Sequence, residues 1–157
     1  MSEFKPRALG NRETRYSYDS PDAGVLEAFD NPNQANDYVV GLDCLEFTSL
    51  CPITGQPDYG SILIDYLPDR LCVESKSLKL YLVSYRNHGS FHEACVNQIA
   101  NHVAAVIAPK YLRVYGDFNA RGGIAIKPMA ERFAEGAPLG EYRALITAYD
   151  RLRRRGT

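Results

Sequence analysis

No stretch of this 157-residue sequence approaches the roughly 18 consecutive apolar residues that a membrane-spanning helix needs. Neither sign of charge is in excess, because 18 Lys and Arg face 19 Asp and Glu, whereas generic nucleic-acid-binding proteins carry a strong basic excess. The opening residues, Met-Ser-Glu-Phe-Lys-Pro-Arg, lack the apolar core of a signal peptide. We therefore expect a cytoplasmic protein with no membrane segment and no direct nucleic-acid partner.

Two common sequence signatures are also missing. No C-x-x-C pair occurs, so a zinc knuckle is not expected. No G-x-G-x-x-G motif follows a predicted strand, which disfavours a Rossmann-type dinucleotide site. In a reducing cytosol the cysteines are expected to be free thiols, so one of them is available as a nucleophile. These cysteines are Cys44, Cys51, Cys72 and Cys95.

The length predicts a single domain over residues 1–157. Turn-forming residues dominate 1–36, which we interpret as an N-terminal arm that packs against the rest of the chain. The catalytic core is expected over 37–130, and residues 131–157 are expected to form a helical tail. The tail ends in arginines, which suit the negative end of a helix dipole.

Within the core, the pattern of apolar residues predicts strands and helices in the order β-β-α-α-β-β. A Pro- and Gly-containing loop separates the first two strands, which indicates a hairpin. Ser90 and Glu93 have the spacing of a capping box at the start of the second helix. The predicted class is therefore α+β, with two helices on one face of an antiparallel four-stranded sheet. The predicted elements are strands near 38–44 and 59–67, helices over 75–85 and from 90 to before Pro109, and strands over 111–118 and 124–126.

The loop of the first hairpin holds the first candidate for chemistry. Cys51 is followed seven positions later by Asp58, across a segment rich in Pro and Gly. A loop cysteine is often a small packing residue, but this loop is poorly suited to form a core. A thiolate that attacks a polarised carbon needs a neighbouring group that handles protons, and Asp58 can fill that role.

Two further candidates lie at the start of the second helix. His92 and Glu93 occupy its first turn, where the positive end of the helix dipole favours anionic or hydrogen-bonding ligands. The alternatives are that Glu93 only caps the helix and that His92 is an ordinary surface residue.

Three cations are candidates for binding phosphate. Lys76 and Lys79 are three residues apart, on one side of the first predicted helix, although a solvated lysine face remains the alternative. Arg121 precedes Gly122 and Gly123 in a predicted turn, where glycines allow a ligand to approach and arginine can grip phosphate with two donors.

Taken together, these segments resemble the unimodular NADPH-dependent 7-cyano-7-deazaguanine reductases, the QueF family of queuosine biosynthesis. The similarity covers about residues 36–128. The residues that carry it are Phe47–Pro52, Gly55–Asp58, Glu74–Tyr81, Arg86–Gly89, Phe91–Glu93 and Arg121–Gly123.

The resemblance implies the tunnelling fold, shared with GTP cyclohydrolase I, in which subunits close edge to edge into a barrel. It also implies reduction of 7-cyano-7-deazaguanine to 7-aminomethyl-7-deazaguanine with two NADPH and no metal. A homo-oligomer, expected to be a decamer of two pentamers, follows from the same resemblance.

The resemblance also assigns roles. Cys51 would add to the nitrile to give a thioimide, and Asp58 would donate the proton. Glu93 would anchor the purine-like edge, with His92 beside it. Substrate contacts from a neighbouring subunit would come from Val73, Glu74 and Ser75, and contacts to the cofactor phosphates from Lys76, Lys79 and Arg121.

Two other functions remain open from the sequence. One is a metal-dependent hydrolase of the tunnelling fold that acts on pterins or purines. The other is a purine-binding assembly protein with no chemistry of its own.

Overall fold

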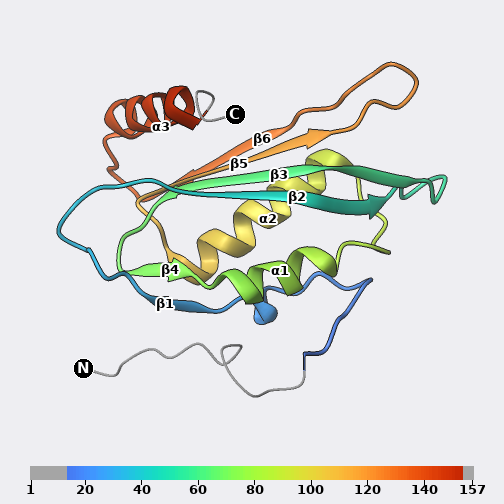
Figure 1. The fold of residues 1–157 in the computed structure, drawn as a ribbon, viewed down its shortest axis with the longest axis horizontal. Coiled ribbons are helices and arrows are strands. Elements are labelled where there is room, and N and C mark those ends of the chain that lie inside the picture. Colours follow the sequence, from blue (N-terminus) through green and yellow to red (C-terminus); the bar gives the residue numbers. More distant parts are fainter. Residues whose placement is uncertain (1–13, 154–157) are drawn as a thin grey trace.

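The computed structural model describes residues 14–153 (Figure 1). Its main sheet is antiparallel and four-stranded, as the sequence predicts, and its strand order is β2-β3-β5-β6. A second, two-stranded sheet pairs β1 with β4 and ties the N-terminal arm to the core. The strands are β1 Ala28–Asp30, β2 Val40–Leu50, β3 Pro57–Leu67, β4 Leu71–Val73, β5 Tyr111–Phe118 and β6 Met129–Phe133. The helices are the short 3₁₀ helix η1 Ala23–Val25 and the α-helices α1 Ser75–Val83, α2 His92–Ile107 and α3 Leu139–Arg153.

The predicted hairpin is confirmed, because β2 and β3 pair in register from Val40 opposite Tyr66 to Leu50 opposite Pro57. One extra residue bulges out of β2 between Cys44 and Phe47. The loop that joins the two strands begins at Cys51, so this residue lies at the end of the sheet.

The two predicted core helices are also confirmed, and both cover the same face of the sheet (Figure 1). Apolar side chains spaced three and four residues apart in α2 pack against alternate residues of β3 and β5, as an amphipathic helix on a sheet requires. No helix in the described part of the chain is long and apolar enough to cross a membrane. The fully buried residues of this contact include Ile62, Ile64, Val96, Ile99, Val103, Leu112 and Val114.

The predicted capping box is wrong. Phe91 is the N-cap residue of α2, and no side chain caps this helix. The physical reason is that Gly89 and Ser90 are held against the last residue of β2: the N–H of Ser90 donates to the carbonyl of Leu50 at 3.0 Å, and Gly89 forms an isolated bridge with Leu50, so the helix begins only after Phe91. Glu93 is exposed in the first turn of the helix.

The last predicted strand is misplaced. Residues 124–126 form no strand, apart from a single bridge between Ile124 and Arg121, and the sheet is completed by β6 at Met129–Phe133. Gly122 and Gly123, both with positive φ, lie in a turn that takes the chain away from β5. Pairing with β5 resumes only at Pro128, whose carbonyl accepts from the N–H of Gly116 at 2.9 Å. The sheet therefore crosses the expected boundary at residue 130, and the tail helix begins only at Leu139.

Helix α3 packs on the face of the sheet opposite α1 and α2 (Figure 1). Ile146 is buried there in a small cluster with Leu67 and Tyr111. Beside this cluster, the fully buried Asp65 accepts from Arg113 at 2.6 Å and from Arg153 at 2.9 Å. These ion pairs fix the C-terminal helix to the sheet.

Candidate functional site

Cys51 begins the loop between β2 and β3, and two backbone hydrogen bonds close this loop. The N–H of Cys51 donates to the carbonyl of Gln56, and the N–H of Gly55 donates to the carbonyl of Cys51, both at 2.9 Å. Hydrogen bonds to the sulfur lower the pKa of Cys51 to about 7; the Thr54 side chain contributes most, followed by the backbone of Thr54 and Ile53 and by the Arg121 side chain. The Cys51 thiol is therefore more readily ionised at neutral pH than an ordinary cysteine.

Asp58 is the second residue of β3, opposite Ser49 of β2, and its side chain is almost completely buried. Its Oδ1 lies 2.9 Å from Nε of Arg121, and its Oδ2 lies 3.1 Å from Nε2 of His92. The second pair is close but poorly aligned for a hydrogen bond, and neither atom has another hydrogen-bond partner in residues 14–153. A buried carboxylate oxygen and an imidazole nitrogen are thus left with unused hydrogen-bonding capacity, which a ligand can satisfy.

His92 is placed by the start of α2 and by the end of β5. Its ring stacks on that of Phe118, with centroids 3.9 Å apart and planes 15° from parallel. His92 is buried, whereas the neighbouring Glu93 is exposed on the same turn. The stack holds the imidazole beside Asp58.

Arg121 is presented by a two-residue turn. Its N–H and carbonyl pair with the carbonyl and N–H of Ile124 at 3.0 and 3.1 Å, and the intervening Gly122 and Gly123 have φ of +58° and +82°. Two consecutive positive φ angles are typical of a type I′ turn and favour glycine at both positions. The turn leaves the Arg121 side chain one-third exposed while it pairs with Asp58.

The other predicted site residues lie towards the opposite end of the sheet. Val73 is buried at the end of β4, and Ser75 is exposed as the first residue of α1. Glu74 is the N-cap of α1, where its two oxygens accept from the N–H groups of Lys76 at 2.9 Å and Ser77 at 2.7 Å. Figure 1 shows that the start of α1 lies well away from the β2–β3 loop.

Predicted site residues are therefore divided into two sets within this chain. The structure brings together Cys51, Asp58, His92 and Arg121, and places Glu93 next to them in the chain. It does not bring the residues from Val73 to Lys79 to the same place.

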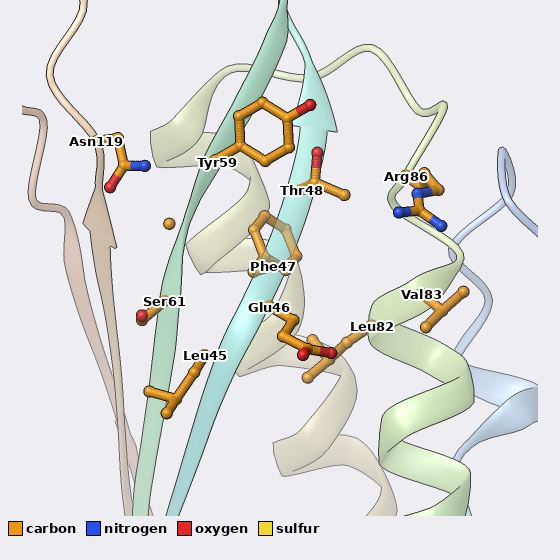
Figure 2. Close-up of a pocket in the computed structure, with 11 residues that line it drawn as sticks. Leu45, Glu46, Phe47, Thr48, Tyr59, Ser61, Leu82, Val83, Arg86 and Asn119 are labelled. Atoms are coloured by element: carbon orange, nitrogen blue, oxygen red, sulfur yellow. The ribbon is translucent and has the colours of Figure 1, made fainter.

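A groove runs between β2 and α1 (Figure 2). It consists of two adjoining cavities of about 490 and 480 Å³. Ser75 and Lys79 line one cavity, while Thr48, Tyr59 and Arg86 line the other. The groove thus extends from the start of α1 towards the end of β2 that leads into Cys51. The walls that the two cavities share are Leu45, Glu46, Phe47, Leu82 and Val83.

Sequence reasoning missed two residues that shape the reactive cluster. The Thr54 side chain contributes most to the lowered pKa of Cys51, and Phe118 supports the His92 ring. The position of Thr54 three residues after the cysteine was an available signal, since Ser and Thr hydroxyls commonly bond within their own turns. Phe118 has no such signal, because its stacking partner is 26 residues away.

No group of three or more His, Cys, Asp or Glu side chains arranged to hold a metal ion occurs within residues 14–153. The four cysteines are all free thiols, and Cys72 and Cys95 are buried.

Comparisons with known proteins agree with this architecture. Residues 57–136 match the family described as QueF-like protein. The chain is 58% identical over 120 residues to the NADPH-dependent 7-cyano-7-deazaguanine reductase of Streptococcus mutans, a match that covers 76% of this chain and 74% of that one. It is also 58% identical over 127 residues to the reductase of the same name from Helicobacter pylori strain HPAG1, covering 80% and 84% of the two chains.

Among solved structures, the apo form of the archaeosine synthase QueF-Like superposes with a TM-score of 0.57. The match covers 61% of this chain and 94% of that chain at 24% sequence identity, so it bears on the fold alone. The predicted tunnelling-fold unit is confirmed.

Proposed function

Because the chain belongs to the family of NADPH-dependent 7-cyano-7-deazaguanine reductases, we propose that it reduces 7-cyano-7-deazaguanine to 7-aminomethyl-7-deazaguanine in queuosine biosynthesis. One observation on the residues of this chain supports this proposal. A thiol whose pKa is lowered to about 7 lies in a loop beside a cluster of Asp58, His92 and Arg121. Such a thiol is a competent nucleophile at neutral pH.

In the proposed reaction, the Cys51 thiolate adds to the nitrile carbon. One C–S bond forms, one π bond of the nitrile breaks, and the nitrogen takes up a proton, which gives a thioimide. Asp58 in its protonated, carboxylic acid form is the proposed proton donor, since the side chain lies in the same cluster and has an oxygen without a hydrogen-bond partner in the described part of the chain. His92, held by its stack on Phe118, is proposed to bind the substrate, together with Glu93.

NADPH supplies hydride, two equivalents for each nitrile reduced to an amine. The groove between β2 and α1 fits an extended cofactor, because its two cavities adjoin and a lysine with an exposed side chain, Lys79, lines one of them. We propose that Lys76 and Lys79 meet the cofactor phosphates from α1 and that Arg121 assists from the turn. Cations of this kind are the usual partners of phosphate groups that lie outside a glycine-rich loop.

The division of the site into two sets supports an oligomeric enzyme. If the residues from Val73 to Ser75 contact substrate at a Cys51 loop, that loop must belong to a neighbouring subunit. The outer edges of β2 and β6 have no strand partner within residues 14–153, and open edges of this kind favour pairing with another copy. We therefore propose a ring-forming homo-oligomer, as in the decamer of two pentamers that the family resemblance implies.

Intact mass spectrometry after incubation with 7-cyano-7-deazaguanine alone tests the proposed chemistry. We expect one substrate mass added per chain, and no addition in Cys51→Ala. Cys44→Ala is a matched control: Cys44 is also a half-buried free thiol, but burial raises its pKa to about 11, so the adduct should persist in this variant.

Other outcomes would point to the rival functions. Adduct formation in Cys51→Ala would refute the assigned nucleophile. Binding of the nitrile without any covalent addition would instead support a non-catalytic purine-binding protein. A stoichiometric metal in the purified protein would favour the hydrolase.

A further inference from the structure

We propose that Ser49 is a further catalytic residue of this site, whose hydroxyl donates a hydrogen bond to the nitrogen of the nitrile while the Cys51 thiolate adds to the carbon. The inference rests on the proposed function and deepens it, because it gives a role to a residue that the family resemblance leaves without one.

Three buried side chains with unused hydrogen-bonding capacity carry the argument. Within residues 14–153, the buried side-chain nitrogen and oxygen atoms that have no hydrogen-bond partner are Oγ of Ser49, Oδ2 of Asp58 and Nε2 of His92. Ser49 is fully buried, and Asp58 and His92 are each 4% exposed. Burying a polar atom without a partner is costly, so three such atoms in one place indicate a position that a polar group of a ligand completes.

The register of the hairpin places Ser49 beside Asp58. Ser49 of β2 lies directly opposite Asp58 of β3. Directly opposed residues project from the same face of a sheet, with Cβ atoms about 4.5 to 5.5 Å apart. His92, at the start of α2, lies on this face with its Nε2 3.1 Å from Oδ2 of Asp58. The three atoms without partners therefore form one cluster between the end of the sheet and the start of α2.

The same strand leads from Ser49 to the proposed nucleophile. The N–H of Cys51 donates to the carbonyl of Gln56 at 2.9 Å, so the pairing of the two strands continues one residue beyond Leu50. Residues two apart in an extended strand share a face, with Cα atoms about 7 Å apart. A small group bonded to the Cys51 sulfur is thus within reach of the Ser49 hydroxyl.

The state of its hydroxyl distinguishes Ser49 from the other buried serines of the described chain. The hydroxyls of Ser77 and Ser84 each donate to a backbone carbonyl three residues earlier. Near Ser49, burial raises the pKa of the Cys95 thiol, and the hydroxyls of Ser90 and Ser49 oppose this rise. A thiol is a weak hydrogen-bond partner, however, and the geometry between Cys95 and Ser49 is not that of a hydrogen bond.

The chemistry of thiolate addition requires a donor at this position. Addition forms the C–S bond and moves one π electron pair of the nitrile onto nitrogen. The nitrogen gains negative charge until it takes the proton of the Asp58 carboxylic acid. A hydroxyl that donates to this nitrogen stabilises charge that is present only while the bond forms, so it lowers the barrier more than it strengthens binding of the free nitrile. The proton of Ser49 stays on its own oxygen.

The test is the rate of adduct formation, followed by intact mass on the full chain with excess 7-cyano-7-deazaguanine and no NADPH. Ser49→Ala should form the adduct about 10- to 100-fold more slowly than the wild type. In the Cys51→Ala background, calorimetry should show that Ser49→Ala changes the Kd of the nitrile by less than about threefold. The Tm of free Ser49→Ala should equal or exceed that of the wild type at the same protein concentration, because a buried hydroxyl without a partner is lost.

Two controls separate this role from a structural one. Ser84→Ala is the matched variant: it removes a buried hydroxyl that has a partner, so it should lower the Tm and leave the adduct rate unchanged. Alkylation of Cys51 by iodoacetamide should proceed in Ser49→Ala at the wild-type rate, because the loop that lowers the pKa of the thiol is intact.

Three results would overturn the inference. One is an adduct rate in Ser49→Ala within about twofold of the wild type. Another is a lower Tm with an unchanged adduct rate, which would show that the hydroxyl holds a resident water molecule. The third is an equal slowing of adduct formation and alkylation, which would show that Ser49 only supports the loop. Absence of any adduct in the wild type is a separate result, which would refute the proposed function itself.

Discussion

Replacing Asp58 with Asn removes the charge that organises the reactive cluster while keeping the shape of the side chain. Loss of a positioned proton donor typically lowers turnover about 10²- to 10⁴-fold, or about 2.7 to 5.4 kcal/mol in activation free energy. The cost in stability should be far smaller. Arg121 is one-third exposed, so it can turn to water when its partner is lost, and we expect a loss of about 1 kcal/mol, or about 2 to 4 °C in Tm.

The assay separates these two effects. NADPH oxidation at saturating substrate gives turnover, and a thermal melt gives stability, while substrate binding is measured by calorimetry with Cys51→Ala as the background. Asp117→Asn is the matched control, because Asp117 is an exposed carboxylate paired with Lys127 at 2.8 Å and lies outside the cluster. Turnover of Asp58→Asn within a few-fold of the wild type would remove Asp58 from the mechanism, and a large fall in Tm would show that its main role is structural.

Three more outcomes follow from the structure. Replacing Lys76 and Lys79 together with Gln should raise the KM for NADPH much more than the KM for NADH; an equal rise would count against contacts to the 2′-phosphate. Glu74→Ala should lower the free energy of unfolding by about 0.5 to 2 kcal/mol, measured in urea, because two amides at the start of α1 lose their acceptor; Glu74→Gln, which keeps one acceptor oxygen, should lose less. Light scattering at micromolar concentration should show an oligomer, and an active monomer would contradict the proposed ring.

Much of the fold follows from local patterns in the sequence. The β2–β3 hairpin and helices α1 and α2 have strong periodicity and clear breakers, and each forms where predicted. The wrong predictions concern positions whose structure depends on a hydrogen-bond or strand partner that is distant in the sequence. Ser90 caps no helix because its backbone is held at the end of β2 by Leu50 and α2 begins one residue later, with Phe91 as its N-cap. The strand expected at 124–126 forms instead at Met129 because that residue pairs with Tyr115.

The position of α3 on the sheet also depends on partners that are distant in the sequence. Its apolar stripe predicts a helix, but the face that it covers depends on Asp65, which accepts from Arg113 and Arg153. Burial raises the pKa of Asp65, and Arg113 opposes this rise. These partners lie 48 and 88 residues away, so no local pattern shows them.

The reactive cluster is intermediate in predictability between the elements that local patterns predict and the elements whose position depends on distant partners. The family motifs point to Cys51, Asp58, His92 and Arg121 one by one, but they do not say which of these side chains meet. In the structure, Asp58 is the common neighbour of His92 and Arg121, and Cys51 begins the loop that leads into the strand of Asp58.

The position of Cys51 has a consequence for the order of the proposed reaction. Cys51 lies in the loop after β2, and its pKa is lowered to about 7 by groups of its own loop, chiefly the Thr54 side chain, so its reactivity requires no bound cofactor. The sulfur must bond to the nitrile carbon before any hydride is transferred, because the C=N group of the resulting thioimide is the proposed hydride acceptor. The covalent adduct is therefore expected to form without NADPH.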